Sequence, residues 1–150
     1  AYSEVELITH DADGNRLVRS AETNLGNLCA EAIRSLVNAD IGYVNGGGLR
    51  SNISAGDVTF NDLLNVFPFN NTVVLAQISG QDIKDMLEMA MMKWPNENGS
   101  FPHLAGASFP EEMSPFPVLS LPSEYPPQMA ARRTMERSRS SRLRSAILPW

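Results

Sequence analysis

The feature that most constrains this fold is the loop at residues 45–50, where three glycines stand between Asn45 and Leu49-Arg50, after an apolar run at 41–44. Glycine lacks a Cβ, so the chain can take positive φ there and bare N–H groups can approach a ligand closely. Asn45 and Arg50 add directed hydrogen-bond donors at the two ends. The pattern indicates either a ligand loop or an ordinary tight turn after a buried strand, and both interpretations stay open at this point.

Two common phosphate-binding loops match these glycines poorly. The chain contains neither a Gly-x-Gly-x-x-Gly motif nor the Gly-Lys-Ser/Thr ending of a P-loop. A Rossmann or P-loop domain is therefore not favoured.

Hydrophobic periodicity predicts an α+β domain with a mixed sheet packed against helices. Alternating apolar residues predict strands over 3–9, 40–44, 72–78 and 104–109. The strand at 72–78 is apolar enough to be central. Helical spacing predicts helices over 24–38 and 80–93, and a short helix after Thr59. Thr23 or Asn24 is the expected cap of the first long helix, and Ser79 or Gly80 begins the second.

The segment after the first strand contains a turn at residues 13–15, so Leu17 and Val18 are expected to return as a hairpin strand. Four oxygen-bearing residues there also have calcium-loop spacing, namely Asp11, Asp13, Asn15 and Glu22. Arg16 stands where that loop requires glycine, and no helix leads in. Calcium binding is therefore disfavoured.

Two phenylalanines flank Pro68, so Phe67 and Phe69 cannot both lie on one regular face. We expect one ring to join the core and the other to stand at a pocket rim, where it can stack on a flat ligand ring; the alternative is that both are buried. Cys29, the only cysteine, lies among apolar residues and is expected to be a small core residue rather than a nucleophile.

Composition divides the chain into two parts. Residues 1–109 carry 6 Lys and Arg against 13 Asp and Glu, whereas residues 110–150 carry 6 against 4. The net charge of −5 argues against a general nucleic-acid binder. No segment has the length of a membrane span, and residues 1–4 lack the pattern of a signal peptide.

The part from 110 to 150 is rich in Pro, Ser and Arg and shows no strand or helix period. Such a segment buries too little apolar surface to offset its ordering entropy, so disorder is expected. A basic arm for an anionic partner is the functional alternative. The abrupt change at Pro110 also suggests foreign sequence, from a shifted reading frame or a mispredicted gene end.

Three motifs occur in a characteristic order: Glu22-Thr23-Asn24-Leu25-Gly26-Asn27-Leu28, Asn45-Gly46-Gly47-Gly48-Leu49-Arg50 and Phe67-Pro68-Phe69-Asn70-Asn71-Thr72. With these motifs, residues 3–109 resemble the C-terminal domain of the 5′-nucleotidase / UDP-sugar hydrolase family. The resemblance implies a domain that holds the nucleoside part of a nucleotide. It also implies a separate N-terminal metallophosphatase domain with two divalent metal ions, and an extracytoplasmic location.

Individual roles follow from the resemblance. Arg19 and Arg50 correspond to sugar-binding arginines, Asn45 to a base-contacting asparagine, and Phe69 to one of two aromatics that sandwich the base. Gly47 and Gly48 belong to the same substrate-binding loop. The resemblance implies neither catalytic residues nor a metal site in this chain.

The chain departs from the family at its C-terminal end. Nothing after Pro110 resembles the Asn-x-Phe-x-x-Gly-Gly-Asp-Gly motif that carries the second aromatic, so the domain is expected to be incomplete there. His10 and His103 are far apart, and no run supplies the ligands of a two-metal phosphoryl site. Three hypotheses stay open: the recognition part of a nucleotide hydrolase, a stand-alone nucleoside-binding or interaction module, and a non-functional gene fragment. With half of its clamp, the fragment is expected to bind a nucleoside at millimolar affinity or weaker.

Overall fold

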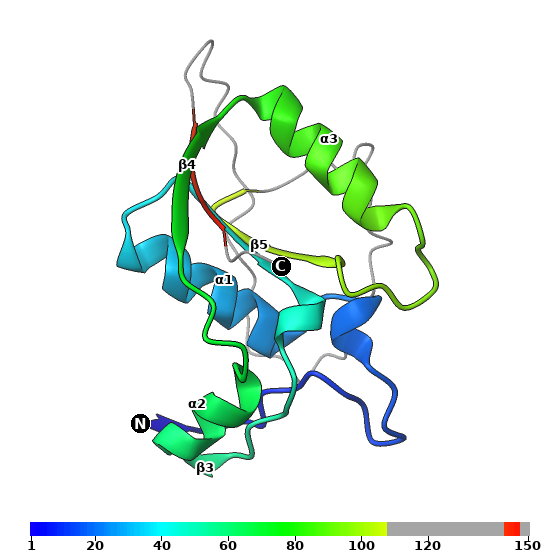
Figure 1. Cartoon of the computed structure of the whole chain (residues 1–150). Coiled ribbons are helices and arrows are strands. Elements are labelled where there is room, and N and C mark those ends of the chain that lie inside the picture. The colour runs from blue at the N-terminus through cyan, green and yellow to red at the C-terminus, as the bar shows by residue number, and fades with distance from the viewer. Residues whose placement is uncertain (108–142, 148–150) are drawn as a thin grey trace.

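A four-stranded mixed sheet forms the centre of the part that the structure describes, residues 1–107 and 143–147 of a computed structural model (Figure 1). Its order is β4 (Val74–Ile78), β6 (Leu143–Ile147), β2 (Ile41–Asn45) and β5 (Pro102–Ala105). β2 is antiparallel to β5 and parallel to β6, and β6 is antiparallel to β4. The sheet and its helices confirm the expected α+β class.

Helices α1 (Asn24–Leu36) and α3 (Gly80–Met91) cover opposite faces of this sheet (Figure 1). Val44 belongs to the core under α1, whereas Ile41 packs with Ile83 and Leu87 under α3. Successive strand residues point to opposite faces, so β2 is buried along its whole length. Each such aliphatic side chain contributes roughly 1.5–3 kcal/mol on burial. Cys29 lies in the α1 core, where burial raises the pKa of its thiol to about 12, which confirms a core role.

The helix starts follow the caps expected from the sequence. Thr23 is the cap of α1, and its hydroxyl oxygen accepts a backbone N–H from the first turn at 3.1 Å. Ser79 with Asp82, and Thr59 with Asp62, form reciprocal capping boxes at the starts of α3 and of α2 (Phe60–Val66). Each cap contributes roughly 1 kcal/mol, which explains why local sequence located these ends well.

The N-terminal segment differs from the predicted strand over 3–9. β1 covers only Tyr2–Ser3 and pairs with β3 (Gly56–Asp57), and an isolated bridge joins Leu7 to Ile53. The next backbone N–H groups, at residues 8–10, donate to side-chain oxygens of Asn24 and Asn52 at 2.7–3.0 Å. These amide side chains take the place of a neighbouring strand, so no regular ladder forms.

The predicted hairpin is also wrong, because residues 17 and 18 belong to the 3-10 helix η1 (Leu17–Arg19) rather than to a strand. The turn before it is closed by Asp11, whose Oδ1 accepts the N–H groups of Asp13 and Asn15 at 3.0 and 2.9 Å. Hydrogen bonding from the Asn15 side chain lowers the pKa of the Asp11 carboxyl. This carboxylate therefore has a structural role in the turn.

The C-terminal side of the sheet corrects two further predictions. Residues 143–147, where the sequence predicts no regular structure, form β6 between β2 and β4 and supply backbone partners to both. β4 is consequently an edge strand of the described sheet rather than a central one, and Val74 and Leu75 are half-exposed. β5 ends at Ala105, before Gly106, whose φ is +78°. Residues 108 and 109 of the predicted strand lie outside the described residues, as does most of the part that was predicted to be disordered.

Candidate functional site

The glycine loop is a 3-10 turn, η2 (Gly46–Gly48), which directly follows β2. None of its glycines has the positive φ that the sequence suggested. The glycines are required by close approach instead: a Cβ on Gly46 would overlap the Val18 carbonyl oxygen, and one on Gly47 would lie 2.9 Å from the Gly99 carbonyl oxygen. The N–H groups of Gly46 and Gly47 donate to the carbonyls of Phe101 and Gly99, both at 2.8 Å, so these two do not act as free ligand donors.

The side chain of Asn45, at the start of this loop, is buried and bonded within the protein. Its side chain is 7% exposed, and Nδ2 donates to the Gly99 carbonyl oxygen at 3.0 Å. The Oδ1 atom lies on the side of Gly48, 3.4 Å from where a Cβ on that glycine would stand. Asn45 thus joins the glycine loop to residues 98–100, and its amide nitrogen is already engaged within the protein.

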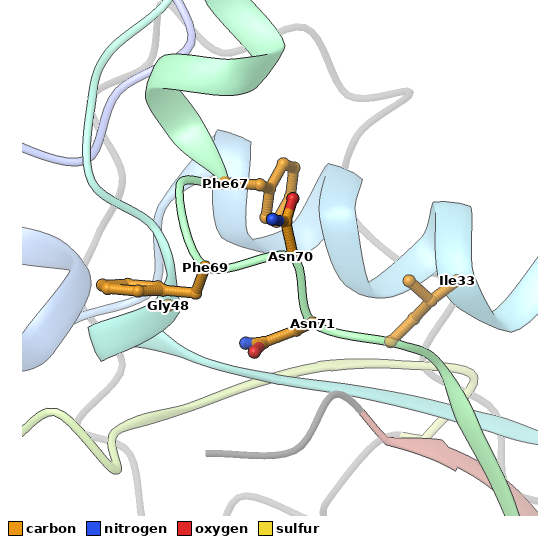
Figure 2. A pocket seen from close by; sticks show the side chains of 6 residues that line it. All are labelled: Ile33, Gly48, Phe67, Phe69, Asn70 and Asn71. Carbon is orange, nitrogen blue, oxygen red and sulfur yellow. The ribbon is translucent and has the colours of Figure 1, made fainter.

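The two phenylalanines separate as the sequence predicts. Phe67 packs against the α1 core, whereas Phe69 is 55% exposed. Figure 2 shows Phe67 directed toward α1 and Phe69 directed away from it, toward the turn at Gly48. The chain turns after Phe69 because Asn70 takes a φ of 51°, a conformation that asparagine tolerates better than most residues. One aromatic face is therefore open beside the glycine loop.

Arg50 connects the glycine loop to this exposed ring. Its guanidinium carbon lies 5.8 Å from the centroid of Phe69, within cation–π range, and Nη1 donates to the Gly47 carbonyl oxygen at 3.4 Å. The Arg50 backbone N–H donates to the Val66 carbonyl oxygen at 3.1 Å, which ties the loop to the end of α2. The charged group and the ring thus belong to one continuous surface.

Arg19 ends η1 and brings a second positive charge to the same region. Burial lowers the pKa of its guanidinium, and the positive charges of Arg16 and Arg50 lower it further, against an opposing effect of Glu97. Arg16 forms an ion pair with Glu97, with 2.5 Å between Nη2 and Oε2. The Arg19 carbonyl oxygen accepts the Asn98 N–H at 2.9 Å, so η1 is attached to the same loop that Asn45 holds.

An open pocket of about 640 Å³ lies between the glycine loop, Phe69 and residues 98–100, and a neighbouring hollow of about 300 Å³ lies around Phe69 and Phe67 (Figure 2). Four of the six predicted site residues line the larger pocket: Asn45, Gly47, Gly48 and Phe69. Arg19 and Arg50 stand beside it and are not among its lining residues. Its other lining residues are Asn71, which belongs to the third motif but was not predicted to bind, and three residues outside the motifs, namely Asn98, Gly99 and Ser100. The stretch Asn98-Gly99-Ser100 has the composition of any surface turn, which gave no functional signal.

The family model described as "5′-nucleotidase, C-terminal domain" matches residues 4–117, most of the chain. The chain belongs to this family. The match extends eight residues past the predicted boundary at 109, and that boundary remains a prediction.

Relatives agree with this assignment. The trifunctional nucleotide phosphoesterase protein YfkN of Bacillus subtilis is 40% identical over 113 residues, covering 72% of this chain and 7% of that protein. A 5′-nucleotidase of Vibrio parahaemolyticus is 41% identical over 97 residues, covering 64% and 17%. A solved 5′-nucleotidase precursor from Thermus thermophilus has a TM-score of 0.64 and 33% identity, over 71% of this chain and 21% of that one.

The chain thus spans about a fifth or less of the length of these proteins, and it corresponds to the C-terminal domain of a hydrolase. Within residues 1–107 and 143–147, no group of three or more His, Cys, Asp or Glu side chains could hold a metal ion. The helices described are also too short or too polar to cross a bilayer.

Proposed function

We propose that this chain is the nucleoside-recognition part of a 5′-nucleotidase-like hydrolase that removes phosphate from nucleotides. The base stacks on the exposed face of Phe69, while Arg19, Asn45 and Arg50 position the sugar and base. The Gly47–Gly48 backbone forms the floor of the pocket. These residues orient the substrate and do not react with it, because recognition groups contribute by holding the reacting centre in place.

The observation that carries the proposal is the half-exposed ring of Phe69 beside a pocket lined by amide groups. A flat base fits against such a ring, and stacking removes apolar area of both partners from water. Stacking of a base on an aromatic side chain contributes roughly 1–3 kcal/mol. The printed names of the relatives, a nucleotide phosphoesterase and 5′-nucleotidases, support a nucleotide as the ligand class.

The phosphate chemistry is assigned to a separate N-terminal metallophosphatase domain that binds two divalent metal ions. Two such ions activate water and stabilise the leaving oxygen in phosphoryl transfer. In this arrangement, the chain described here requires no cofactor of its own. The parent protein is proposed to act outside the cytoplasm, as the family resemblance implies.

The test is a calorimetric titration of the full 150-residue chain with adenosine, AMP and ribose. We expect saturable binding of adenosine and AMP with a dissociation constant of about 1 mM or weaker, or roughly 4 kcal/mol or less of binding free energy. Binding should be lost in Phe69→Ala and kept in Phe60→Ala, since Phe60 at the start of α2 is also exposed, at 74%, but does not line the pocket.

The outcomes separate the hypotheses. Equal binding by Phe69→Ala and the parent chain would reject the stacking role. A dissociation constant below about 10 μM would contradict the incomplete-clamp argument and favour a stand-alone binding module. Absence of binding together with poor folding would favour a gene fragment. Phosphatase activity of the chain with added divalent metal would contradict the assignment of chemistry to another domain.

A further inference from the structure

His103 lies on β5, opposite Val44 of β2, and its side chain is fully buried. The Nε2 atom is 2.9 Å from the carbonyl oxygen of Val18, 85 residues away in sequence. A carbonyl oxygen only accepts, so Nε2 carries the hydrogen. Nδ1 is buried with no hydrogen-bond partner in the part of the chain that the structure describes. The ring is therefore a neutral imidazole with its hydrogen on Nε2.

The ring of His103 is confined by its neighbours. A Cβ on Gly26 would overlap Nδ1 and the adjoining ring carbons, so glycine is required where α1 passes the imidazole. Phe101 meets the imidazole edge to face, with ring centroids 5.6 Å apart. These contacts hold the Nε2–H group in one direction, toward the Val18 carbonyl.

That carbonyl stands at the junction of the pocket elements. Val18 directly precedes Arg19, and its carbonyl oxygen is also the atom against which Gly46 packs. The Arg19 carbonyl in turn receives the Asn98 N–H, and residue 98 lines the pocket. One buried hydrogen bond thus connects β5 to η1, the glycine loop and the pocket wall.

We propose that His103 is a positioning residue of the nucleoside site: its Nε2–H fixes the Val18 carbonyl and thereby sets the place of Arg19 and of the glycine loop. The effect on ligand binding rests on the proposed function, whereas the effect on η1 does not. Neither histidine was singled out as a site residue from sequence, because the contact of His103 joins segments 85 residues apart.

Two variants of the full chain separate this role from mere filling of the core. His103→Gln keeps an uncharged N–H donor at similar reach, whereas His103→Leu keeps apolar volume and removes the donor. His103→Leu should raise the hydrogen-exchange rates of the Val18 and Asn98 backbone amides at least about tenfold. The Leu87 amide of α3 is the internal control, and its exchange rate should not change. His103→Gln should stay within about threefold of the parent. Equal rates in the leucine variant and the parent would overturn the proposal, as would equal disturbance by both variants.

A measurement on the unaltered chain keeps the proposal testable even if the leucine variant does not fold. Nitrogen-15 NMR at neutral pH should show the His103 ring with its hydrogen on Nε2 and a bare Nδ1. A ring with its hydrogen on Nδ1, or a charged ring, would overturn the proposal.

Adenosine titration adds the functional part. Binding should be weakened in His103→Leu and recovered in His103→Gln, and unaltered binding in the leucine variant would overturn the positioning role. If the parent chain binds no adenosine, the proposed function fails, and hydrogen exchange and the ring tautomer still decide whether His103 fixes η1.

Discussion

Acid should destabilise this chain through His103 well before its carboxylates are fully protonated. Burial lowers the pKa of this imidazole from 6.5 to about 4, against an opposing effect of its hydrogen bond to Val18. The unfolded chain therefore binds the proton more readily than the folded one. The stabilisation is fully present above pH 6.5 and is lost as the pH falls from 6.5 to about 4.

The size of this effect follows from the two pKa values. At about 1.4 kcal/mol per pH unit, the interval between 6.5 and about 4 corresponds to a loss of about 3 kcal/mol. That is a large share of the 5–15 kcal/mol that typically stabilises a domain. Because the group is fully buried, water does not screen this contribution.

The assay is urea unfolding of the parent chain and of His103→Gln at several pH values between 7.5 and 4. Glutamine does not titrate, and carboxylates with lowered pKa such as Asp62 and Asp82 contribute equally to both proteins. The stability of the parent relative to the variant should therefore fall by about 3 kcal/mol over this range. If the stability difference between the parent and the variant stays constant within about 1 kcal/mol, His103 is not a buried neutral imidazole and the reasoning is refuted.

Three further predictions concern packing. Gly26→Ala should lower the free energy of unfolding by about 1–3 kcal/mol, because the new Cβ displaces the His103 ring. Gly80→Ala, with no atom within 4 Å of the new Cβ, should leave thermal stability unchanged or raise it. Gly47→Ala should lower the free energy of unfolding by about 1 kcal/mol or more, because the new Cβ meets the Gly99 backbone. Gly48→Ala should lower it by less than about 0.5 kcal/mol, since the atom nearest to its Cβ is 3.4 Å away. Equal losses in the two variants would contradict the close approach of Gly47 to Gly99. Cys29 should react with a thiol reagent at pH 8 only at the rate of unfolding, and rapid labelling of the folded chain would place it at the surface instead.

The elements that could be predicted from sequence are those with strong local signals. The capped helices α1 and α3 and the apolar strand β2 fall within a few residues of their expected bounds, because caps and periodicity act over one or two turns. The separation of Phe67 and Phe69 also followed from a local rule, the proline between them.

The features that sequence did not predict depend on distant partners. The backbone N–H groups of residues 8–10 donate to the side-chain oxygens of Asn24 and Asn52 rather than to a neighbouring strand. β6 forms in a stretch whose surroundings show no strand period, because it pairs with β2 on one side and with β4 on the other. The glycines of η2 are required by Val18 and Gly99, contacts that no local pattern of glycines can reveal.

The same distinction holds for the candidate site. Its motif residues were found because they cluster in short recognisable stretches, whereas the wall at residues 98–100 and the His103 bond were not. Both come from the segment after α3, whose composition is that of an ordinary loop and a short strand. The motif residues thus supply one side of the pocket, and the segment after α3 holds them in place.

The most direct test of the central claim is an NMR titration of the full chain with adenosine, following every assigned backbone amide. We predict saturable shifts that are largest at residues 45–48, 69–71 and 98–100, with α3 almost unaffected and with the shifts abolished by Phe69→Ala. Shifts that concentrate elsewhere, or that persist without the Phe69 ring, would contradict the account of this pocket as the nucleoside site.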